Sequence, residues 1–227
     1  STLSSSSAAS DVYKRQTESE RGLIYREAIA LEVPYHPTQG NPMVQPTLII
    51  IDMQRGMLEP AAGPRNNPEA PARIAELLQA WRHADAWVVH VRHISRSTGS
   101  LFAPGQASAE FQPALLPLPT EHVVEKNVPD AFINSGLERW LRVRDIQSLV
   151  IVGVSTNNSV EATARTAGNL GFSTHVVADG CYSFDKTDYN GVLRSADEVH
   201  AMALANLHDE YAQVISSREA QDLLTKP

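Results

Sequence analysis

From Thr47 almost to its end, the chain alternates short apolar runs with segments that carry apolar residues at helical spacing. The runs LIII at 48–51 and LVIV at 149–152 contain no polar position, which is typical of strands that are buried on both faces of a parallel sheet. Strands that alternate with helices indicate βαβ units. We therefore expect an α/β protein with three α/β/α layers: a mainly parallel six-stranded sheet of Rossmann-like type with helices on both faces.

The expected elements follow from this alternation. A first helix is expected to begin at Asn67, with Pro68 in its first turn, and a second at Ser135, with Glu138 completing a capping box. A third follows the fourth strand and ends near Gly171. The expected strands are 47–52, 86–91, 122–126, 148–153, 173–178 and 211–216.

The length of 227 residues suits one large domain with an extension. Residues 1–46, rich in serine and then in proline, are expected to be a partly disordered leader and arm, and 47–227 the folded domain. Net charge is −7 and no long basic cluster occurs, which argues against nucleic acid as a partner. The apolar runs are far shorter than the roughly 20 residues that span a bilayer. A single cysteine favours a reducing compartment such as the cytoplasm.

Three polar residues stand at or just after the ends of expected strands. Asp52 ends the first, Lys126 ends the third, and Ser159 follows the fourth. In open α/β sheets, ligands bind beyond the carboxyl ends of the strands. A carboxylate, an ammonium group and a hydroxyl there predict acyl transfer, although Asp52 alone is better explained as a cap after the strand and Lys126 alone as a solvated strand end.

These residues lie in segments that together resemble the isochorismatase-like hydrolases, a family that includes nicotinamidases and other cysteine-dependent amidohydrolases. The resemblance spans about 47–217. Its segments are IIIDMQRGML (49–58), VVHVRH (88–93), VVEKNVPDAF (123–132), GVSTNNSVEATARTAGNLGF (153–172), VVADGCYSFD (176–185) and EVHAMALANL (198–207).

The resemblance implies a catalytic triad of Asp, Lys and Cys, which maps onto Asp52, Lys126 and position 159. It also implies a cis peptide bond between Val154 and Ser155, and an oxyanion hole made by the backbone amides of Ser155 and Ser159. Without the resemblance, the serine and threonine after the fourth strand are equally explained by a turn.

The chain departs from the family pattern because position 159 is serine. The only cysteine, Cys181, follows the fifth expected strand and is interpreted as a buried, inert thiol. A thiol with a pKa of about 8.5 ionises far more readily than a hydroxyl. Three explanations stay open: a cysteine-to-serine replacement, a natural serine nucleophile, or lost activity. The family's isochorismate-cleaving members work without cysteine, so serine does not by itself imply inactivity.

The sequence predicts no metal and no cofactor. His90 and His93 flank Arg92 with alternating orientation, and the Asp-x-His pattern that holds metal in nicotinamidases is missing. The 99–119 segment is expected to cover the site. Residues expected to contact substrate, with Phe132 and Phe184 equally explained as core, are Gln54, His93, Phe132, Asn157, Asn158, Tyr182 and Phe184.

The expected function is hydrolysis of a small-molecule amide or related C–N bond. Asp52 is the expected base, Lys126 the electrostatic support and Ser159 the nucleophile or its substitute. Hydrolysis of an ether or ester by water that Asp52 activates is one alternative, and a silent metabolite-binding protein is another. The family resemblance also implies a homo-oligomer, either a dimer or a tetramer.

Overall fold

The computed structural model describes residues 45–224. Its centre is a six-stranded sheet with the order β3-β2-β1-β4-β5-β8, in which every neighbouring pair is parallel. The expected α/β/α architecture is therefore confirmed, with a sheet that is wholly rather than mainly parallel. The strands are β1 (Thr47–Ile51), β2 (Val88–His93), β3 (His122–Lys126), β4 (Ser148–Val154), β5 (Ser173–Tyr182) and β8 (Gln213–Ile215).

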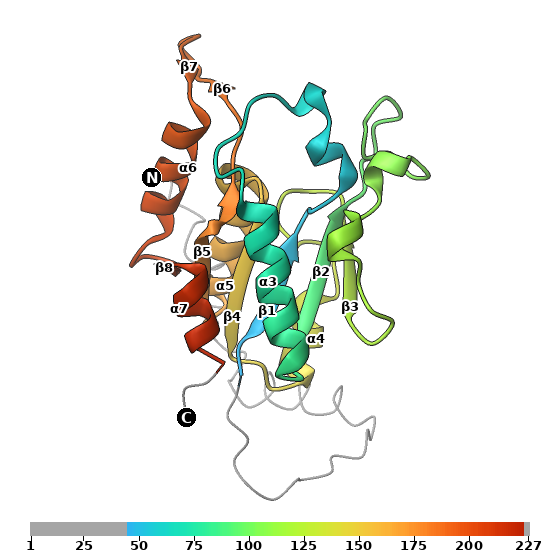
Figure 1. Cartoon of the computed structure of the whole chain (residues 1–227), viewed down its shortest axis with the longest axis vertical. Helices are drawn as coiled ribbons and strands as arrows, with labels where there is room; N and C mark the ends of the chain where they lie inside the picture. The colour runs from blue at the N-terminus through green and yellow to red at the C-terminus, as the bar shows by residue number, and fades with distance from the viewer. Residues whose placement is uncertain (1–44, 225–227) are drawn as a thin grey trace, which may run out of the picture. The chain divides into compact units, whose positions relative to one another are not determined.

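Helices cover both faces of this sheet. The faces alternate along each strand: Leu48 and Ile50 of β1 pack with one set of helices, whereas Ile49 and Ile51 pack with the other. In Figure 1, α3 and α7 lie on the near side of the sheet. The helices are α3 (Ala70–His83), α4 (Leu137–Val143), α5 (Glu161–Asn169), α6 (Ala196–Leu207) and α7 (Ser217–Asp222).

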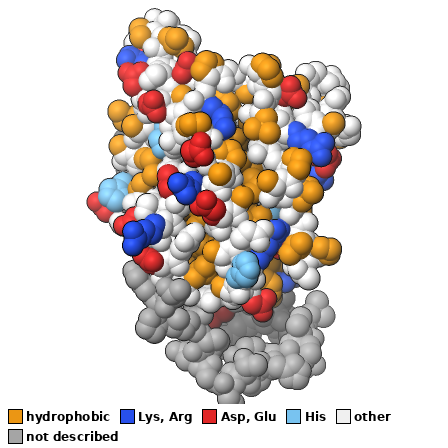
Figure 2. All heavy atoms as spheres, in the orientation of Figure 1, with side chains coloured by type: hydrophobic (Ala, Val, Ile, Leu, Met, Phe, Trp, Pro, Cys, Tyr) orange, Lys and Arg blue, Asp and Glu red, His pale blue; other side chains and the backbone are white. Residues whose placement is uncertain are grey.

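The loops after the carboxyl ends of the strands contain most of the remaining structure, at the upper end of Figure 1. A two-stranded antiparallel hairpin of β6 and β7 also lies there, and Figure 2 shows hydrophobic side chains on the surface at its upper left. The exposed apolar side chains of the hairpin include Tyr189 and Leu193. The sequence reading did not foresee this hairpin. The short elements are η1 (Arg55–Leu58), η2 (Pro60–Ala62), η3 (Ala107–Ala109), η4 (Pro113–Leu115), the π-helix η5 (Thr156–Val160), β6 (Lys186–Thr187) and β7 (Leu193–Arg194).

Two expected helix starts are wrong. Helix α3 begins at Ala70, because the side chain of Asn67 is committed to the carbonyl oxygens of Ala178 and Cys181 instead of to a helix cap. Helix α4 begins at Leu137 without a capping box. The Ser135 hydroxyl donates to the Ala131 carbonyl, so it joins the preceding turn. Capping boxes occur at the starts of α6 and α7 instead.

The expected leader and arm, 1–46, lies outside the described residues except for its last two positions. Of these, Pro46 is buried, and its carbonyl accepts a hydrogen bond of 2.6 Å from the Trp81 indole of α3. Among residues 45–224, no helix is long and apolar enough to cross a membrane.

Gly153 allows β4 to run close beside β1 at the point where the site begins. Its φ is +126°, and a Cβ there would lie 2.1 Å from the carbonyl oxygen of Ile51. We expect Gly153→Ala to lower the free energy of unfolding by at least about 4 kcal/mol, because the obstacle is backbone and cannot rotate away. Gly171, with φ +84° and open space around it, is the matched control. Gly171→Ala is expected to cost about 1 kcal/mol. Equal urea midpoints for the two variants would refute the argument.

Candidate active site

The candidate site lies where the strand order reverses, between β1 and β4. To one side of β1 the chain proceeds through β2 to β3, and to the other through β4 to β5. The loops after β1 and β4 therefore leave in opposite directions, which opens a crevice at the carboxyl ends of these strands. Asp52 directly follows β1, and η5 with Ser159 follows β4.

Asp52 turns sharply out of β1. Its φ is +51°, in the left-handed region, and its carbonyl accepts a hydrogen bond of 2.7 Å from the amide of Gln54 only two residues on. The left-handed conformation costs a residue other than glycine roughly 1 kcal/mol, and aspartate tolerates it better than most. Because of this turn, the Asp52 carboxyl does not follow the alternating side-chain directions of the strand, and it contacts Lys126.

Lys126 links the other two members of the predicted triad. Its Nζ donates to Asp52 Oδ2 at 2.6 Å and to Ser159 Oγ at 3.1 Å. All three side chains are buried, and none exceeds 6% exposure as a residue. The structure therefore brings together the carboxylate, the ammonium group and the hydroxyl that the sequence placed after three different strands.

The electrostatics of the site favour a base at Asp52. Burial raises the pKa of the Asp52 carboxyl, while the neighbouring Lys126 ammonium opposes the rise. Asp52 Oδ1 is buried and has no hydrogen-bond partner among the described residues. A carboxylate oxygen that is free of other bonds can accept a proton from a neighbouring hydroxyl or from a water molecule.

Ser159 sits in the π-helix η5, which leads directly into α5. π-helical turns are rare and are found frequently at functional sites. The peptide bond between Val154 and Ser155 is cis, which is the bond that the family resemblance indicated. Ser155 directly precedes η5 and Ser159 lies within it, and the backbone amides of these two residues are the ones expected to form the oxyanion hole.

His93 and a nearby cavity border the triad. The half-buried His93 imidazole lies close enough to Lys126 and Asp52 for both charges to act on its pKa, which burial lowers. Its ring packs edge-on to Phe102, with centroids 6.2 Å apart. A cavity of about 720 Å³ at the ends of β2 and β3 is lined by Lys126, Asn127 and residues 94–98, including the exposed Arg96.

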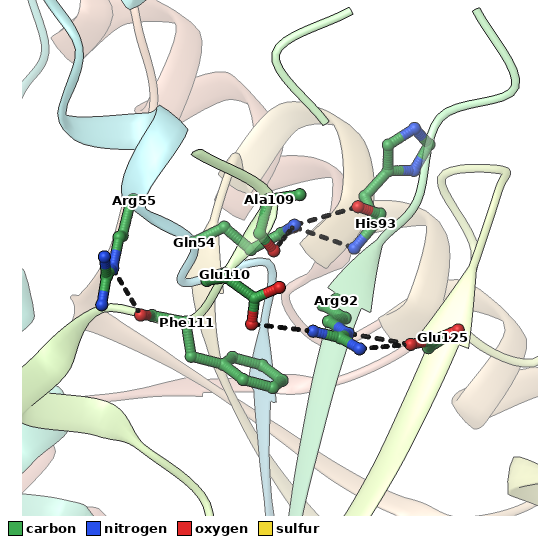
Figure 3. Close-up of polar contacts among 8 residues, drawn as sticks. All are labelled: Gln54, Arg55, Arg92, His93, Ala109, Glu110, Phe111 and Glu125. Atoms are coloured by element: carbon green, nitrogen blue, oxygen red, sulfur yellow. Dashed lines mark hydrogen bonds and ion pairs between the residues drawn. The ribbon is translucent and has the colours of Figure 1, made fainter. Parts of the chain in front are cut away.

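The Gln54 side chain, an expected substrate contact, bonds to the backbone of two neighbouring segments. Its side-chain amide donates to the carbonyl oxygens of His93, at 2.9 Å, and Ala109, at 2.7 Å, and accepts from the His93 amide at 2.8 Å. The residue is fully buried. Figure 3 shows the Gln54 amide between the end of β2 and the segment that contains Ala109. Gln54 is therefore a clamp that fixes the cover of the site.

Arg92 strengthens the same clamp from outside. Its guanidinium binds Glu110 at 3.2 Å and Glu125 at 2.5 Å, so it ties the 107–111 segment to β2 and β3 (Figure 3). The 99–119 segment, which is expected to cover the site, is thus anchored near its middle by one buried amide and by the ion pairs of Arg92.

We expect Gln54→Leu to lower the free energy of unfolding by about 3 kcal/mol. Leucine is similar in shape to glutamine but forms no hydrogen bonds, so three backbone groups would be left without their buried partner. Gln112→Leu is the control, since the Gln112 amide makes one bond, of 3.2 Å, to the Gln54 carbonyl. That variant is expected to lose about 1 kcal/mol. Urea unfolding measures both changes, and equal losses would contradict the clamp.

The remaining expected substrate contacts divide into two groups. Phe132 stacks on Phe172 in the core, and Tyr182 is fully buried beneath the Arg65 guanidinium, while their contact with substrate stays a prediction. Burial raises the pKa of the Tyr182 hydroxyl to about 12. Phe184 packs half-buried against Tyr182. His93 and Asn157 are half-buried and Asn158 is exposed, and their contact with substrate likewise stays a prediction.

Cys181 and His90 are both fully buried. Burial raises the pKa of the Cys181 thiol to about 12, so it is protonated at neutral pH. His90 is fully buried and bonds Glu121 at 2.9 Å, on the opposite side of β2 from His93. Among residues 45–224, no three histidine, cysteine, aspartate or glutamate side chains gather as metal ligands would.

A parallel doubly wound sheet with a buried carboxylate, ammonium and hydroxyl at its switch point defines an α/β protein with hydrolase-like site chemistry. The isochorismatase domain model matches residues 46–219. The chain therefore belongs to the isochorismatase family, a family of hydrolases.

Known relatives agree with this assignment. The crystal structure of an isochorismatase-family protein from Chromobacterium violaceum superposes with a TM-score of 0.79 at 46% identity, covering 84% of this chain and 99% of that one. The uncharacterized isochorismatase family protein YrdC of Bacillus subtilis is 34% identical over 75% of this chain and 91% of its own length. The ureidoacrylate amidohydrolase RutB of Acinetobacter baylyi is 37% identical over 37% of this chain and 34% of its own.

Proposed function

We propose that this protein hydrolyses a small-molecule amide or related C–N bond. The observation that carries the proposal is the single ammonium group of Lys126, which binds both the Asp52 carboxylate and the Ser159 hydroxyl inside a buried site. The amidohydrolase name of one relative supports the bond type.

In the proposed reaction, Asp52 removes the proton from Ser159 Oγ as this oxygen attacks the carbonyl carbon of the substrate. Lys126 stabilises the negative charge that develops on Oγ, because it already lies 3.1 Å from that atom. The backbone amides of Ser155 and Ser159 are proposed to bind the carbonyl oxygen in the tetrahedral state.

Protonated Asp52 then gives its proton to the leaving nitrogen, and the C–N bond breaks to leave an acyl ester on Ser159. A water molecule enters, and Asp52 takes its proton as the water oxygen attacks the ester carbonyl carbon. The C–O bond to Ser159 then breaks, Asp52 returns the proton to Oγ, and the acid leaves with the hydroxyl restored. The raised pKa of Asp52 suits both steps, since a stronger base removes the proton more readily and still returns it.

Mass spectrometry of the intact protein after rapid quenching tests this route. The protein would be mixed with a panel of small primary amides, ureido acids and activated anilides. We expect an acyl adduct that maps to Ser159 and disappears as product forms. Turnover without an adduct would favour direct attack by water that Asp52 activates, and absence of both turnover and adduct would favour a silent metabolite-binding protein.

We also propose that the protein assembles as a homo-oligomer. Helix α6 has apolar residues on its outer as well as its inner side, and its Met202 is 63% exposed. Ala201 and Ala205 beside it are exposed too, and exposed apolar patches are typical of protein–protein interfaces. Sedimentation equilibrium tests the assembly, and a monomer at micromolar concentration would contradict it.

A further inference from the structure

The first residue of the π-helix η5 contacts a histidine from a helix that lies much later in the sequence. Thr156 is fully buried, and its Oγ1 lies 2.8 Å from Nδ1 of His200 in α6. Burial lowers the pKa of His200, so its imidazole is neutral at pH 7. A neutral imidazole carries one donor and one acceptor nitrogen. The Thr156 hydroxyl can accept a hydrogen bond from a donor nitrogen or donate one to an acceptor nitrogen.

The other side of His200 faces a second fixed group. Its Nε2 lies 3.5 Å from Nδ2 of Asn67, and this Asn67 nitrogen donates to the carbonyl oxygens of Ala178, at 3.0 Å, and Cys181, at 2.7 Å. These carbonyls belong to the part of β5 where its register with β4 slips. His200 is therefore placed between the irregular part of β5 and the start of η5.

The second residue of η5 is fixed from the same direction. The side-chain oxygen of Asn157 accepts from the Ser183 hydroxyl at 3.2 Å, and the Ser183 amide donates to Asn66 Oδ1 at 2.8 Å. Thr156 and Asn157 are therefore both anchored by polar side chains that stand outside the triad of Asp52, Lys126 and Ser159.

We propose that His200 is a positioning residue, which fixes Thr156 and thereby the distance between Ser159 Oγ and Lys126 Nζ. Only two residues separate Thr156 from Ser159 within one turn of η5. A displacement of about 1 Å at a reacting atom can cost on the order of 100-fold in rate. The inference rests on the proposed role of Ser159 as nucleophile, and it assigns function to a histidine that touches no member of the triad.

A thiol at position 159 makes the positioning measurable without a substrate. In Ser159→Cys, the new thiol would lie beside the Lys126 ammonium, which lowers a thiol pKa. Cys181 is silent, because burial raises the pKa of its thiol to about 12. The ultraviolet absorbance of the thiolate and the rate of alkylation by iodoacetamide both report the pKa at position 159.

In the Ser159→Cys background, we expect His200→Leu to raise the thiol pKa and to slow alkylation at pH 7 about tenfold. Thr156→Val is expected to have the same effect. The double variant is expected to have no larger effect, because both substitutions remove the same contact between Thr156 and His200. His200→Asn, whose side-chain amide can occupy the place of Nδ1, is expected to restore most of the rate. His175→Leu is the control, because His175 lies in the first half of β5, opposite Val150.

An unchanged thiol pKa in both folded single variants would overturn the proposal, as would an equal effect in the His175 control. If His200→Leu fails to fold, Thr156→Val decides, since it leaves His200 in place. If the variants shift the thiol pKa but the protein hydrolyses no amide, the positioning role stands and the proposed reaction is refuted. If the protein hydrolyses an amide but the variants leave the thiol pKa unchanged, the proposed reaction stands and the positioning role is refuted.

Discussion

Replacing Ser159 with alanine is expected to lower amide turnover by about 1,000-fold or more, and replacing it with cysteine to raise turnover about tenfold. Alanine removes the atom that is proposed to form the acyl bond, and loss of a nucleophile is among the largest effects known in hydrolases. Cysteine gains because its thiol ionises at a much lower pKa than a hydroxyl, and Lys126 already lies 3.1 Å from the position of Oγ.

The measurement is kcat/KM for the best amide of the panel with each variant. Ser173→Ala is the matched control, because Ser173 is exposed at the opposite end of the sheet, at the start of β5. Equal activity of the serine and alanine proteins would show that position 159 is not the nucleophile and would favour water activated by Asp52. A cysteine variant slower than the serine protein would mean that the site is adapted to a hydroxyl.

The triad was predictable from the sequence because strand ends are predictable. The apolar runs of β1, β3 and β4 end within one or two residues of the predicted positions, and parallel strands bring their carboxyl ends to one edge of the sheet. Asp52 and Lys126 were therefore placed at the same edge of the sheet, although one strand, β2, lies between β1 and β3. The roles of the residues, in contrast, came from the family resemblance and stay proposals.

The side-chain contacts around the site were not predictable, because nearness to a strand end does not say which way a side chain points. Gln54 and Tyr182 both stand beside strand ends, yet Gln54 binds three backbone groups and Tyr182 joins the core. The contact between Thr156 and His200 joins residues 44 positions apart across two helices. Side-chain contacts of this range depend on tertiary packing, for which a single sequence carries no periodic signal.

Helix starts failed for a related reason. The Ser135 and Glu138 pair matches a capping box in spacing, but the Ser135 hydroxyl is satisfied by the Ala131 carbonyl in the preceding turn. Asn67 likewise finds partners on β5. Serine and asparagine bond to whichever backbone group the fold brings near, so their local patterns predict a cap only when no competing partner lies close.

Lys126→Met is expected to abolish turnover and to make stability strongly dependent on pH. The substitution leaves the Asp52 carboxyl buried without its cation, which raises its folded-state pKa further. A carboxyl whose pKa is higher in the folded than in the unfolded state stabilises the fold below the unfolded pKa of about 4, and this contribution is lost as pH rises through the folded pKa. Relative to wild type, the variant is expected to lose about 3 to 5 kcal/mol at pH 8 and clearly less at pH 5.

Urea unfolding at both pH values separates the charge effect from simple loss of packing. In Asp52→Asn combined with Lys126→Met, no ionised group remains in the pair, so we expect most of the pH dependence to vanish and part of the stability to return. Lys186→Met, at an exposed position in β6, should change stability by no more than about 0.5 kcal/mol. A single Lys126→Met variant whose loss is the same at pH 5 and pH 8 would show that Asp52 does not depend on Lys126 for its charge, and the proposed base would then need another source of electrostatic support.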